Sequence, residues 1–501
     1  MCRIVLILSL LGTLCPAQPA QPALPARIVG PLTVSANPNY FQDASGAVLI
    51  LNGSHTWNNL QDWGSNGSLQ PMDFGAYVKF LTAHGHNFTL LWYTEFPKFH
   101  GFPSTTTSPP DLTVAPHPWL RTGPGMATDG GPKFDLTHFD PQYFDRLRTR
   151  TRALLDAGIY AGIYLFTGEW QNIYRSSTDG YPLTGANNIN GIDDEYTDGK
   201  KGTGSVAMTA PNAITRIQDA YVEHVVDTLN DLPNVLWVVS EEAPAESKWW
   251  NDHHIAHLRA YESQKPHQHP IGFGTFIGAP DTLLYDSDAD WVKPQVRVSP
   301  TRSCGSGKPR CKVNVNDSDH SYWELWNDTP QKNRNYAWEN FMTGNQVMFM
   351  DPYVVHYPRQ ARNLCVSPVN AICSAPDARY DNLRDNLGYI VKYSRRLKLA
   401  AMTPNGALSS TGYCLVQAPS SGAAYLVYAP EGGPFAVDLS GLPEGRQLAV
   451  EWFDPSTGAV VHARTISAGA ALQRFTAPFS GDAVLYLSET AARAGNPPAS
   501  R

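Results

Sequence analysis

Two pairs of acidic residues follow apolar runs that have the composition of β-strands. Glu241 and Glu242 come directly after the run NVLWVVS, and Asp317 and Asp319 stand at and just beyond the end of KVNVND. Two carboxyl groups that face each other can catalyse hydrolysis together, because one protonates the leaving group while the other attacks the substrate or activates water. Neighbouring side chains of a strand point to opposite faces, so we expect one glutamate, Glu242, to face the site. Turn or cap roles, and calcium binding, are the alternatives for the aspartates.

Other polar and aromatic residues follow the remaining strand-like runs. For each of these residues alone, a packing role is a simpler explanation than a functional one. All of them, however, fall at the same ends of the expected strands. Flat aromatic rings there could stack on the apolar faces of sugars. We find no Arg, no Lys and no phosphate-binding glycine loop at these strand ends, which argues against phosphorylated substrates. The candidate substrate-binding residues, besides Glu241, are His55, Trp57, Trp92, Glu95, Glu169, Trp170, His320, Asp351 and Tyr353.

Eight apolar runs rich in β-branched and aromatic residues supply the elements that would position these groups. Several are continuously hydrophobic, which is typical of parallel strands covered on both faces. The runs span residues 48–53, 87–93, 159–166, 234–240, 269–276, 288–294, 312–317 and 346–353. Helical periods lie between several of them, as in Phe74, Tyr77, Val78 and Leu81. This alternation predicts an α/β fold, a (β/α)₈ TIM barrel with its active site at the carboxyl ends of the strands.

Segments 94–140 and 168–211 follow predicted strands and are rich in Gly, Pro, Thr, Asn and Asp. Loops in that position lie at the face of a barrel where active sites occur, so we expect these two segments to shape a cleft. The helices between strands five and seven have weak periodicity, which makes that part of the prediction the least constrained.

The hydrophobic pattern of the sequence changes after about residue 402. From there, short runs of alternating apolar and polar residues are separated by turn residues such as those of DPSTG. This pattern predicts a C-terminal antiparallel β-sandwich. We therefore divide the chain into a signal peptide (1–20), a barrel (30–400), a sandwich (401–490) and a disordered tail (491–501). The connection over 398–408 is short, so we expect the sandwich to share an apolar interface with the barrel.

The N-terminus has the features of a secretory signal peptide. Arg3 precedes an apolar run of 11 residues, IVLILSLLGTL, and small residues and prolines follow. The run is too short to span a bilayer, so we expect export to the periplasm or medium and no membrane anchor in the mature protein. Cys15 would be the site of a lipoprotein anchor, but Leu14 before it is too large for a typical lipobox.

Cysteine spacing and overall charge limit the remaining possibilities. In an oxidising compartment we expect disulfides between Cys304 and Cys311 and between Cys365 and Cys373, with Cys414 left in a strand. Without CxxC or paired-histidine spacing beside them, these cysteines are not expected to hold a metal, and no cofactor is predicted. The net charge of −7 does not favour nucleic acid or an anionic membrane as a partner. We expect a monomer.

The run NVLWVVSEE resembles the fourth-strand motif of clan A glycoside hydrolases. In that clan the strand leads into an Asn-Glu pair whose Glu is the acid/base, so the resemblance gives that role to Glu242 and places Glu241 at the Asn position. The segments FQDASGAVLILNGSHTW and KFDLTHFDPQYFDRLRTRTRALLDAGIYAGIYLF are similar to cellulase-like and apiosidase-like barrels, and WFDPSTG resembles collagen-binding sandwich domains. The resemblance covers most of residues 35–490.

The chain departs from this clan at strand seven, where the clan has a nucleophilic Glu. This region offers Asp317, Asp319 and His320, with Glu324 a few residues further on. The resemblance implies a secreted glycoside hydrolase in which Asp319 or Asp317 is nucleophile or base, with retaining and inverting chemistry both open. Because Asp is shorter than Glu, we expect the two carboxyls to stand at or beyond about 5–5.5 Å, the retaining separation. The alternative is a non-catalytic carbohydrate- or matrix-binding protein with a degenerate barrel.

Overall fold

The computed structural model describes residues 27–490 except for 57–58, 66–68, 70, 101–110, 169–177, 195–203, 299–310, 323–324, 326–327, 354–377, 418 and 470–471. The predicted signal peptide and C-terminal tail lie outside these residues. So do Trp57, Glu169, Trp170 and Glu324, and at least one cysteine of each predicted disulfide. Among the described helices, none is long and apolar enough to cross a membrane.

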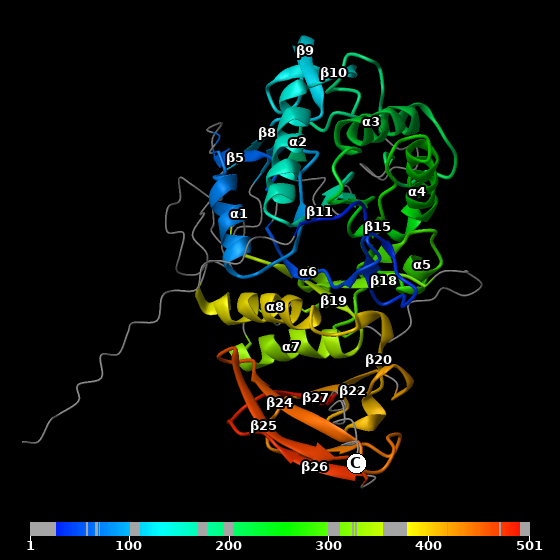
Figure 1. Cartoon of the computed structure of the whole chain (residues 1–501). Helices are drawn as coiled ribbons and strands as arrows, with labels where there is room; N and C mark the ends of the chain where they lie inside the picture. Colours follow the sequence, from blue (N-terminus) through cyan, green and yellow to red (C-terminus); the bar gives the residue numbers. More distant parts are fainter. Residues whose placement is uncertain are drawn as a thin grey trace, which may run out of the picture.

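Eight parallel strands close into a barrel, which confirms the predicted (β/α)₈ fold (Figure 1). Each strand is buried on both faces, in agreement with the continuous apolar runs of the sequence. Around the barrel the strands follow the order β11, β13, β15, β17, β18, β19, β4, β6. Their bounds are β4 Gly53–His55, β6 Phe88–Leu91, β11 Tyr160–Tyr164, β13 Val235–Val238, β15 Ile271–Phe273, β17 Trp291–Val292, β18 Val313–Asp317 and β19 Gln346–Met350.

The first barrel strand lies further along the chain than the sequence predicted. The expected strand at 48–53 divides, so that β3 (Val48–Leu49) joins a small antiparallel sheet with β1 (Thr33–Val34) and β2 (Phe41–Gln42), while β4 enters the barrel. Gly53 allows this entry because a Cβ there would lie 2.0 Å from the carbonyl oxygen of Phe88. The apolar side chains of Ile50 and Leu51 are buried without belonging to a barrel strand, which is why the pattern placed the strand too early.

Helices cover the outside of the barrel, and their ends carry local signals. Asp140 caps α2 ahead of Pro141, and Asn212 forms a capping box with Thr215 at the start of α3. In the weakly patterned region, the four-residue α5 is the only helix among the described residues between β15 and β18. The helices are α1 Phe74–Ala83, α2 Pro141–Asp156, α3 Ala213–Leu229, α4 Lys248–Glu262, α5 Thr282–Tyr285, α6 Ser318–Ser321, α7 Pro330–Met342 and α8 Asp381–Ser394.

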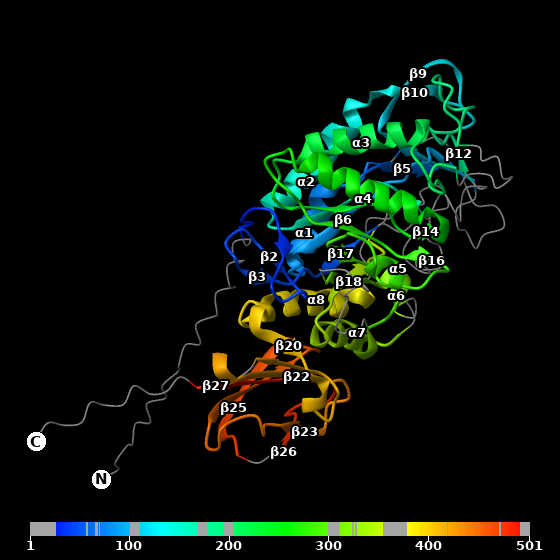
Figure 2. The same ribbon diagram turned by 90° about the vertical axis from the view of Figure 1, so that its right-hand side faces the viewer.

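Segments that follow the barrel strands add further β-structure beyond the barrel (Figure 2). One four-stranded sheet has the order β12, β7, β8, β5, and β9 pairs with β10 in an antiparallel ribbon. These parts come largely from the two long segments that the sequence placed at the active-site face. Their bounds are β5 Asp62–Ser65, β7 Lys98–Phe99, β8 Leu112–Ala115, β9 Trp119–Met126, β10 Pro132–Phe139 and β12 Thr178–Asp179.

The C-terminal part forms an antiparallel sheet of six strands in the order β20, β21, β22, β27, β24, β25, with β23 and β26 paired beside it. Cys414, in β21, is free and buried, as predicted. The strands are β20 Met402–Pro404, β21 Cys414–Gln417, β22 Ala424–Ala429, β23 Pro434–Asp438, β24 Gln447–Asp454, β25 Ala459–Ser467, β26 Leu472–Thr476 and β27 Ala483–Glu489.

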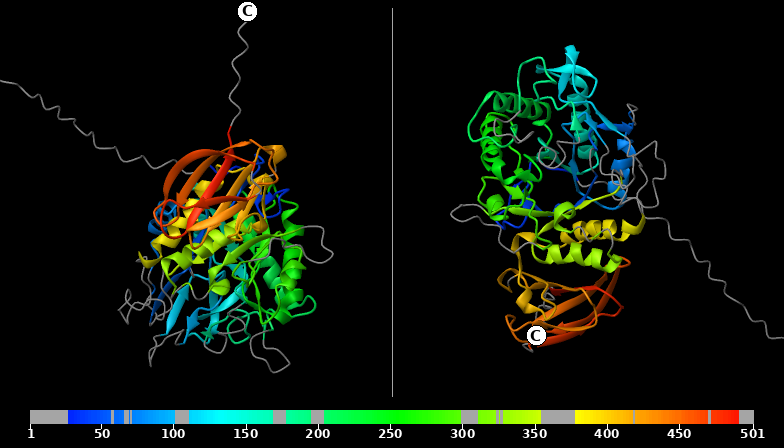
Figure 3. Two further views of the ribbon diagram at one scale, coloured as in Figure 1. Left: turned by 90° about the horizontal axis from the view of Figure 1, so that it is seen from below. Right: turned by 180° about the vertical axis from the view of Figure 1, so that it is seen from behind.

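The sandwich packs against α7 and α8, which separate it from the barrel strands (Figure 3). Trp338 of α7 stacks on Tyr428 with ring centroids 6.0 Å apart, and Arg334 donates through Nε to the buried Asp482 carboxylate at 3.0 Å. One hydrophobic cluster contains side chains from both parts, so the predicted apolar interface is confirmed. Its members include Tyr336, Phe341, Leu387, Ile390, Leu415, Leu426, Phe453 and Val484.

Candidate active site

A buried lysine connects two carboxylates at the carboxyl end of the barrel. Lys293, directly after β17, lies 2.9 Å from Oδ2 of Asp317 at the end of β18. Its ammonium also contacts the carboxylate of Glu241, beyond β13, and the hydroxyl of Tyr164 at the end of β11. Tyr164 in turn donates a hydrogen bond to Glu241. Four strands therefore contribute to one charged network.

Lys293 is the positive centre of this network, between the two carboxylates Glu241 and Asp317. Burial alone lowers the pKa of Lys293, but the charges of Asp317 and Glu241 outweigh it and raise that pKa above its usual value. The side chains of Lys293, Glu241 and Asp317 are each at most 1% exposed, so water does not screen their attraction. The ion pairing with Lys293 therefore holds the side chains of Glu241 and Asp317 in place.

Asp317 has further partners that fix its position. His55, at the end of β4, places Nε2 3.2 Å from Oδ1 of Asp317. The same oxygen accepts the backbone N–H of Asp319 at 3.1 Å, which makes Asp317 the N-cap of α6. The cap role that the sequence left open for Asp317 is therefore present, and it sets the backbone position of Asp319.

Glu242 stands where the regular strand pairing is interrupted. The barrel pair β13–β15 ends before it, and a second parallel pair, β14 (Ala243–Pro244) with β16 (Phe276–Ile277), begins after it. Glu242 has φ of 47°, the sole positive φ of a non-glycine residue among the described residues. Such a backbone costs about 1–3 kcal/mol and recurs at functional sites. Because the strand has ended, the alternation rule used to separate Glu241 from Glu242 does not apply here.

Two glycines leave room for this turn. A Cβ on Gly274 would lie 2.1 Å from Oε1 of Glu241, and a Cβ on Gly168 would lie 2.5 Å from Cβ of Ala243. The backbone after β15 and the backbone after β11 thus approach the turn more closely than any other residue would allow. These contacts hold Glu241 and the chain around Glu242 from two sides.

Glu242 and Asp319 are two carboxyl groups of this site whose pKa values are raised. Burial, followed by the charge of Glu241, raises the pKa of Glu242 to about 8, against the opposing effect of Lys293. Burial, followed by the charge of Glu242, raises the pKa of Asp319 well above its usual value. Since the charge of Glu242 raises the pKa of Asp319, the two groups titrate as an interacting pair.

Several predicted site residues contact neighbouring elements of the fold. Asp351 forms a buried ion pair with Arg384 of α8, at 2.6 Å from Nη2, and the ring of Tyr353 packs at a tilt against Phe80 of α1 with centroids 4.8 Å apart. Both side chains therefore contact the helix layer. Glu95 accepts hydrogen bonds from the hydroxyl and backbone N–H of Thr167, at 2.9 and 3.2 Å.

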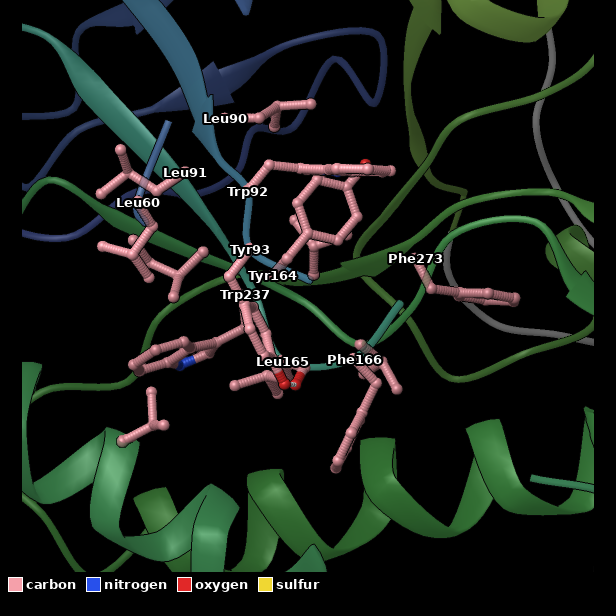
Figure 4. Close-up of a cluster of buried hydrophobic side chains, with 14 of the residues drawn as sticks. Leu60, Leu90, Leu91, Trp92, Tyr93, Tyr164, Leu165, Phe166, Trp237 and Phe273 are labelled. Carbon is pink, nitrogen blue, oxygen red and sulfur yellow. Dashed lines mark hydrogen bonds between the residues drawn. The ribbon is translucent and has the colours of Figure 1, made fainter. Parts of the chain in front are cut away.

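Trp92 is fully buried and packs edge-on against the ring of Tyr164, with centroids 5.1 Å apart (Figure 4). Its ring therefore contacts a member of the Lys293 network, and neither face of the ring is open for stacking on a substrate. His320 lies in α6 beside Asp319.

Neither Lys293 nor Tyr164 was predicted as a site residue from the sequence. The statement that no lysine stands at the strand ends was wrong, since Lys293 follows the apolar pair Trp291–Val292 of the predicted sixth strand. A lysine at the end of an apolar barrel strand could have signalled a buried acidic partner. Because two carboxylates already neutralise Lys293, its presence does not create a phosphate site.

Solved structures with the same architecture cover nearly the whole chain. A protein from Bacteroides vulgatus described as a "putative glycoside hydrolase" superposes with a TM-score of 0.62 at 14% identity, covering 92% of this chain and 82% of the other. A family 5 glycoside hydrolase from the same organism gives a TM-score of 0.59 at 13% identity, covering 92% and 93%. The barrel has a glycoside hydrolase-like fold. Among curated proteins, no relative matches the sequence.

The C-terminal sandwich has its own match. Residues 407–488 match the family described as "Putative collagen-binding domain of a collagenase". Together with the barrel, this match bears out the resemblance drawn from WFDPSTG and from the fourth-strand motif.

Proposed function

We propose that this protein is a secreted glycoside hydrolase that cleaves glycosidic bonds of a polysaccharide or its side chains. Glu242 is the general acid/base, and Asp319 is the second carboxyl group. One observation carries the proposal: at the face where TIM barrels have their active sites, Glu242 on its left-handed turn and Asp319 on α6 follow closely on two buried carboxylates that share the ammonium of Lys293. Burial and mutual charge raise the pKa of both Glu242 and Asp319. Secretion rests on the predicted signal peptide.

The charges around the site assign different roles to the four carboxyl groups. A single ammonium, that of Lys293, contacts two carboxylates, Glu241 and Asp317. Two further negative charges on Glu242 and Asp319 would be uncompensated in a buried setting, so this pair favours holding a proton. A carboxyl group with a pKa of about 8 is protonated at neutral pH and can protonate a leaving oxygen.

Asp319 suits the second role better than Asp317 does. The oxygens of Asp317 are occupied by Lys293, His55 and the N–H of Asp319, so Asp317 is a positioning residue. Asp319 has its charge coupled to Glu242 instead. Once Glu242 holds the proton, an ionised Asp319 can act as nucleophile or base.

The test compares Glu242→Gln and Asp319→Asn with the wild type on a panel of polysaccharides and aryl glycosides. We expect kcat/KM to fall by about 10²–10⁴-fold for each variant, because each removes one proton-transfer group. Glu246→Gln is the matched control, since Glu246 is exposed and lies four residues further on. Retention of most activity by folded Glu242→Gln would remove Glu242 from the acid/base role. The anomer released first, read by NMR, distinguishes retention from inversion.

A non-catalytic binding protein is the second candidate, favoured by the absence of the clan's strand-seven glutamate. Binding of an oligosaccharide without any product release, by a protein whose Glu242 is intact, would support it. The match of residues 407–488 makes collagen a further ligand to include in that binding assay.

A further inference from the structure

Helices α3 and α4 lie side by side on the outside of the barrel (Figure 2), and histidines of α4 contact acidic residues of α3. His253 places Nε2 2.9 Å from Oδ1 of Asp219, and His257 places Nε2 3.2 Å from Oε1 of Glu223. His253 and His257 are four residues apart, so one face of α4 presents both rings toward acids of α3. The two helices therefore meet through a row of histidine–acid contacts.

His254, next to this row, is a fully buried imidazole without a hydrogen bond. Neither of its ring nitrogens has a hydrogen-bond partner among the described residues, although Nδ1 lies 3.4 Å from Oδ1 of Asp219. Its ring packs on Phe166 and Trp250, with centroids 4.8 and 5.1 Å away. Buried ring nitrogens normally have partners, so this one calls for an explanation.

We propose that Asp219, His253 and His254 form a binding site for a divalent transition-metal ion, Zn²⁺ by ligand chemistry, that ties α3 to α4. The ligand atoms of the three side chains lie within 4.8 Å of one another. The ion would accept the lone pair of His254 Nδ1 that no hydrogen bond uses. It would also replace the proton that His253 and Asp219 share.

The donor spacing fits the geometry of such an ion. With bonds of about 2.0–2.1 Å, two ligands of a tetrahedral Zn²⁺ stand about 3.3 Å apart. The nitrogens of His253 and His254 lie 2.9 and 3.4 Å from the same Asp219 oxygen, so these two donor separations are within a few tenths of an ångström of the tetrahedral value, and all three donors lie within 4.8 Å of one another. Two imidazoles and one carboxylate favour Zn²⁺, Ni²⁺ or Cu²⁺ over Ca²⁺ or Mg²⁺, which prefer oxygen ligands alone.

The site is also accessible to an ion. The side chains of His253 and Asp219 are 20% and 19% exposed, which gives an ion a path from solvent. An ordinary His253–Asp219 ion pair would explain these two residues but not the unpartnered His254.

Isothermal titration of the chelator-stripped full chain with ZnCl₂, on protein without a polyhistidine tag, tests the proposal. We expect one Zn²⁺ per chain, a melting temperature about 3–5 °C higher at 100 times the Kd, and at least about tenfold weaker binding in Asp219→Asn and His253→Gln. Co²⁺ in place of Zn²⁺ should give the visible absorption of a tetrahedral ion. His138→Gln is the control, since this histidine also contacts an aspartate, Asp135, at 2.8 Å but outside the cluster.

Two results would overturn the proposal: a wild-type chain without one-to-one binding, or Asp219→Asn and His253→Gln variants that bind Zn²⁺ as tightly as His138→Gln. Should His254→Gln fail to fold, the test still stands on Asp219 and His253, whose side chains are partly exposed. The readouts are binding and melting, so the outcome is independent of hydrolytic activity.

Discussion

Replacing Lys293 by Met removes a cation that contacts both Glu241 and Asp317 while keeping most of the side-chain volume. Breaking a buried ion pair by removing one partner costs about 3–5 kcal/mol, because the remaining charge is left uncompensated. Here two carboxylates lose their contact with the same ammonium, so we expect a loss near the upper end of that range at pH 7. Catalysis should fall as well, since Lys293 also opposes the raised pKa of Asp319, which has to ionise.

The pH dependence of the free energy of unfolding shows whether the missing ammonium causes the loss of stability. The ammonium of Lys293 opposes the raised pKa values of Glu242 and Asp319, so its removal raises both folded-state pKa values further above the unfolded values near about 4. A raised folded pKa means that the folded state binds more protons. The variant is therefore least impaired below the unfolded pKa and loses stability as pH rises toward the folded pKa. Each unit of separation corresponds to about 1.4 kcal/mol per group.

Urea denaturation of wild type and Lys293→Met at pH 5 and pH 8 measures this difference, with Lys332→Met as the matched control. The Lys332 side chain is 62% exposed and contacts Asp328 four residues earlier at 3.1 Å, so its removal should change the free energy of unfolding by less than about 1 kcal/mol. A Lys293→Met variant that loses less than about 1 kcal/mol at pH 8, or loses the same amount at both pH values, would refute the buried network.

Three further predictions concern other parts of the molecule. The kcat/KM of the wild type should fall as pH rises through about 8, because Glu242 then loses the proton that it donates, and a profile flat from pH 7 to 9 would contradict this. Asp351→Asn should lower the free energy of unfolding by an amount near the lower end of about 3–5 kcal/mol, since it removes the fully buried carboxylate and leaves Arg384 its contact with the partly exposed Asp381 at 2.7 Å. The kcat of the folded fraction should remain unchanged, and a selective loss of kcat would return Asp351 to the substrate site. Mass spectrometry of the unreduced secreted protein should show bridged Cys304–Cys311 and Cys365–Cys373, with alkylation confined to Cys414, whereas alkylation of all five would argue against export.

The order of elements and the face that carries the acids could be predicted from local pattern. Continuous apolar runs identify parallel strands because both of their faces are buried, and the closed barrel contains all eight. The carboxyl ends of such strands meet at one face, so the positions of Glu242, Asp317 and Asp319 relative to their strands were enough to predict that they lie together. The first strand was misplaced because Ile50 and Leu51 are buried outside the barrel sheet.

The sequence by itself determined the barrel, the sandwich and the face on which Glu242 and Asp319 lie, because hydrophobic periodicity and position relative to a strand are local properties of the chain. Only the tertiary structure decided the role of each acid. Lys293 is distant in sequence from both Glu241 and Asp317, yet the closure of the barrel brings the three into contact. Beyond the end of a strand the backbone no longer alternates, so Asp351 contacts the helix layer and Glu242 adopts a left-handed turn. A carboxyl group's pKa depends on burial and on charges from distant segments, and these exist only once the chain has folded.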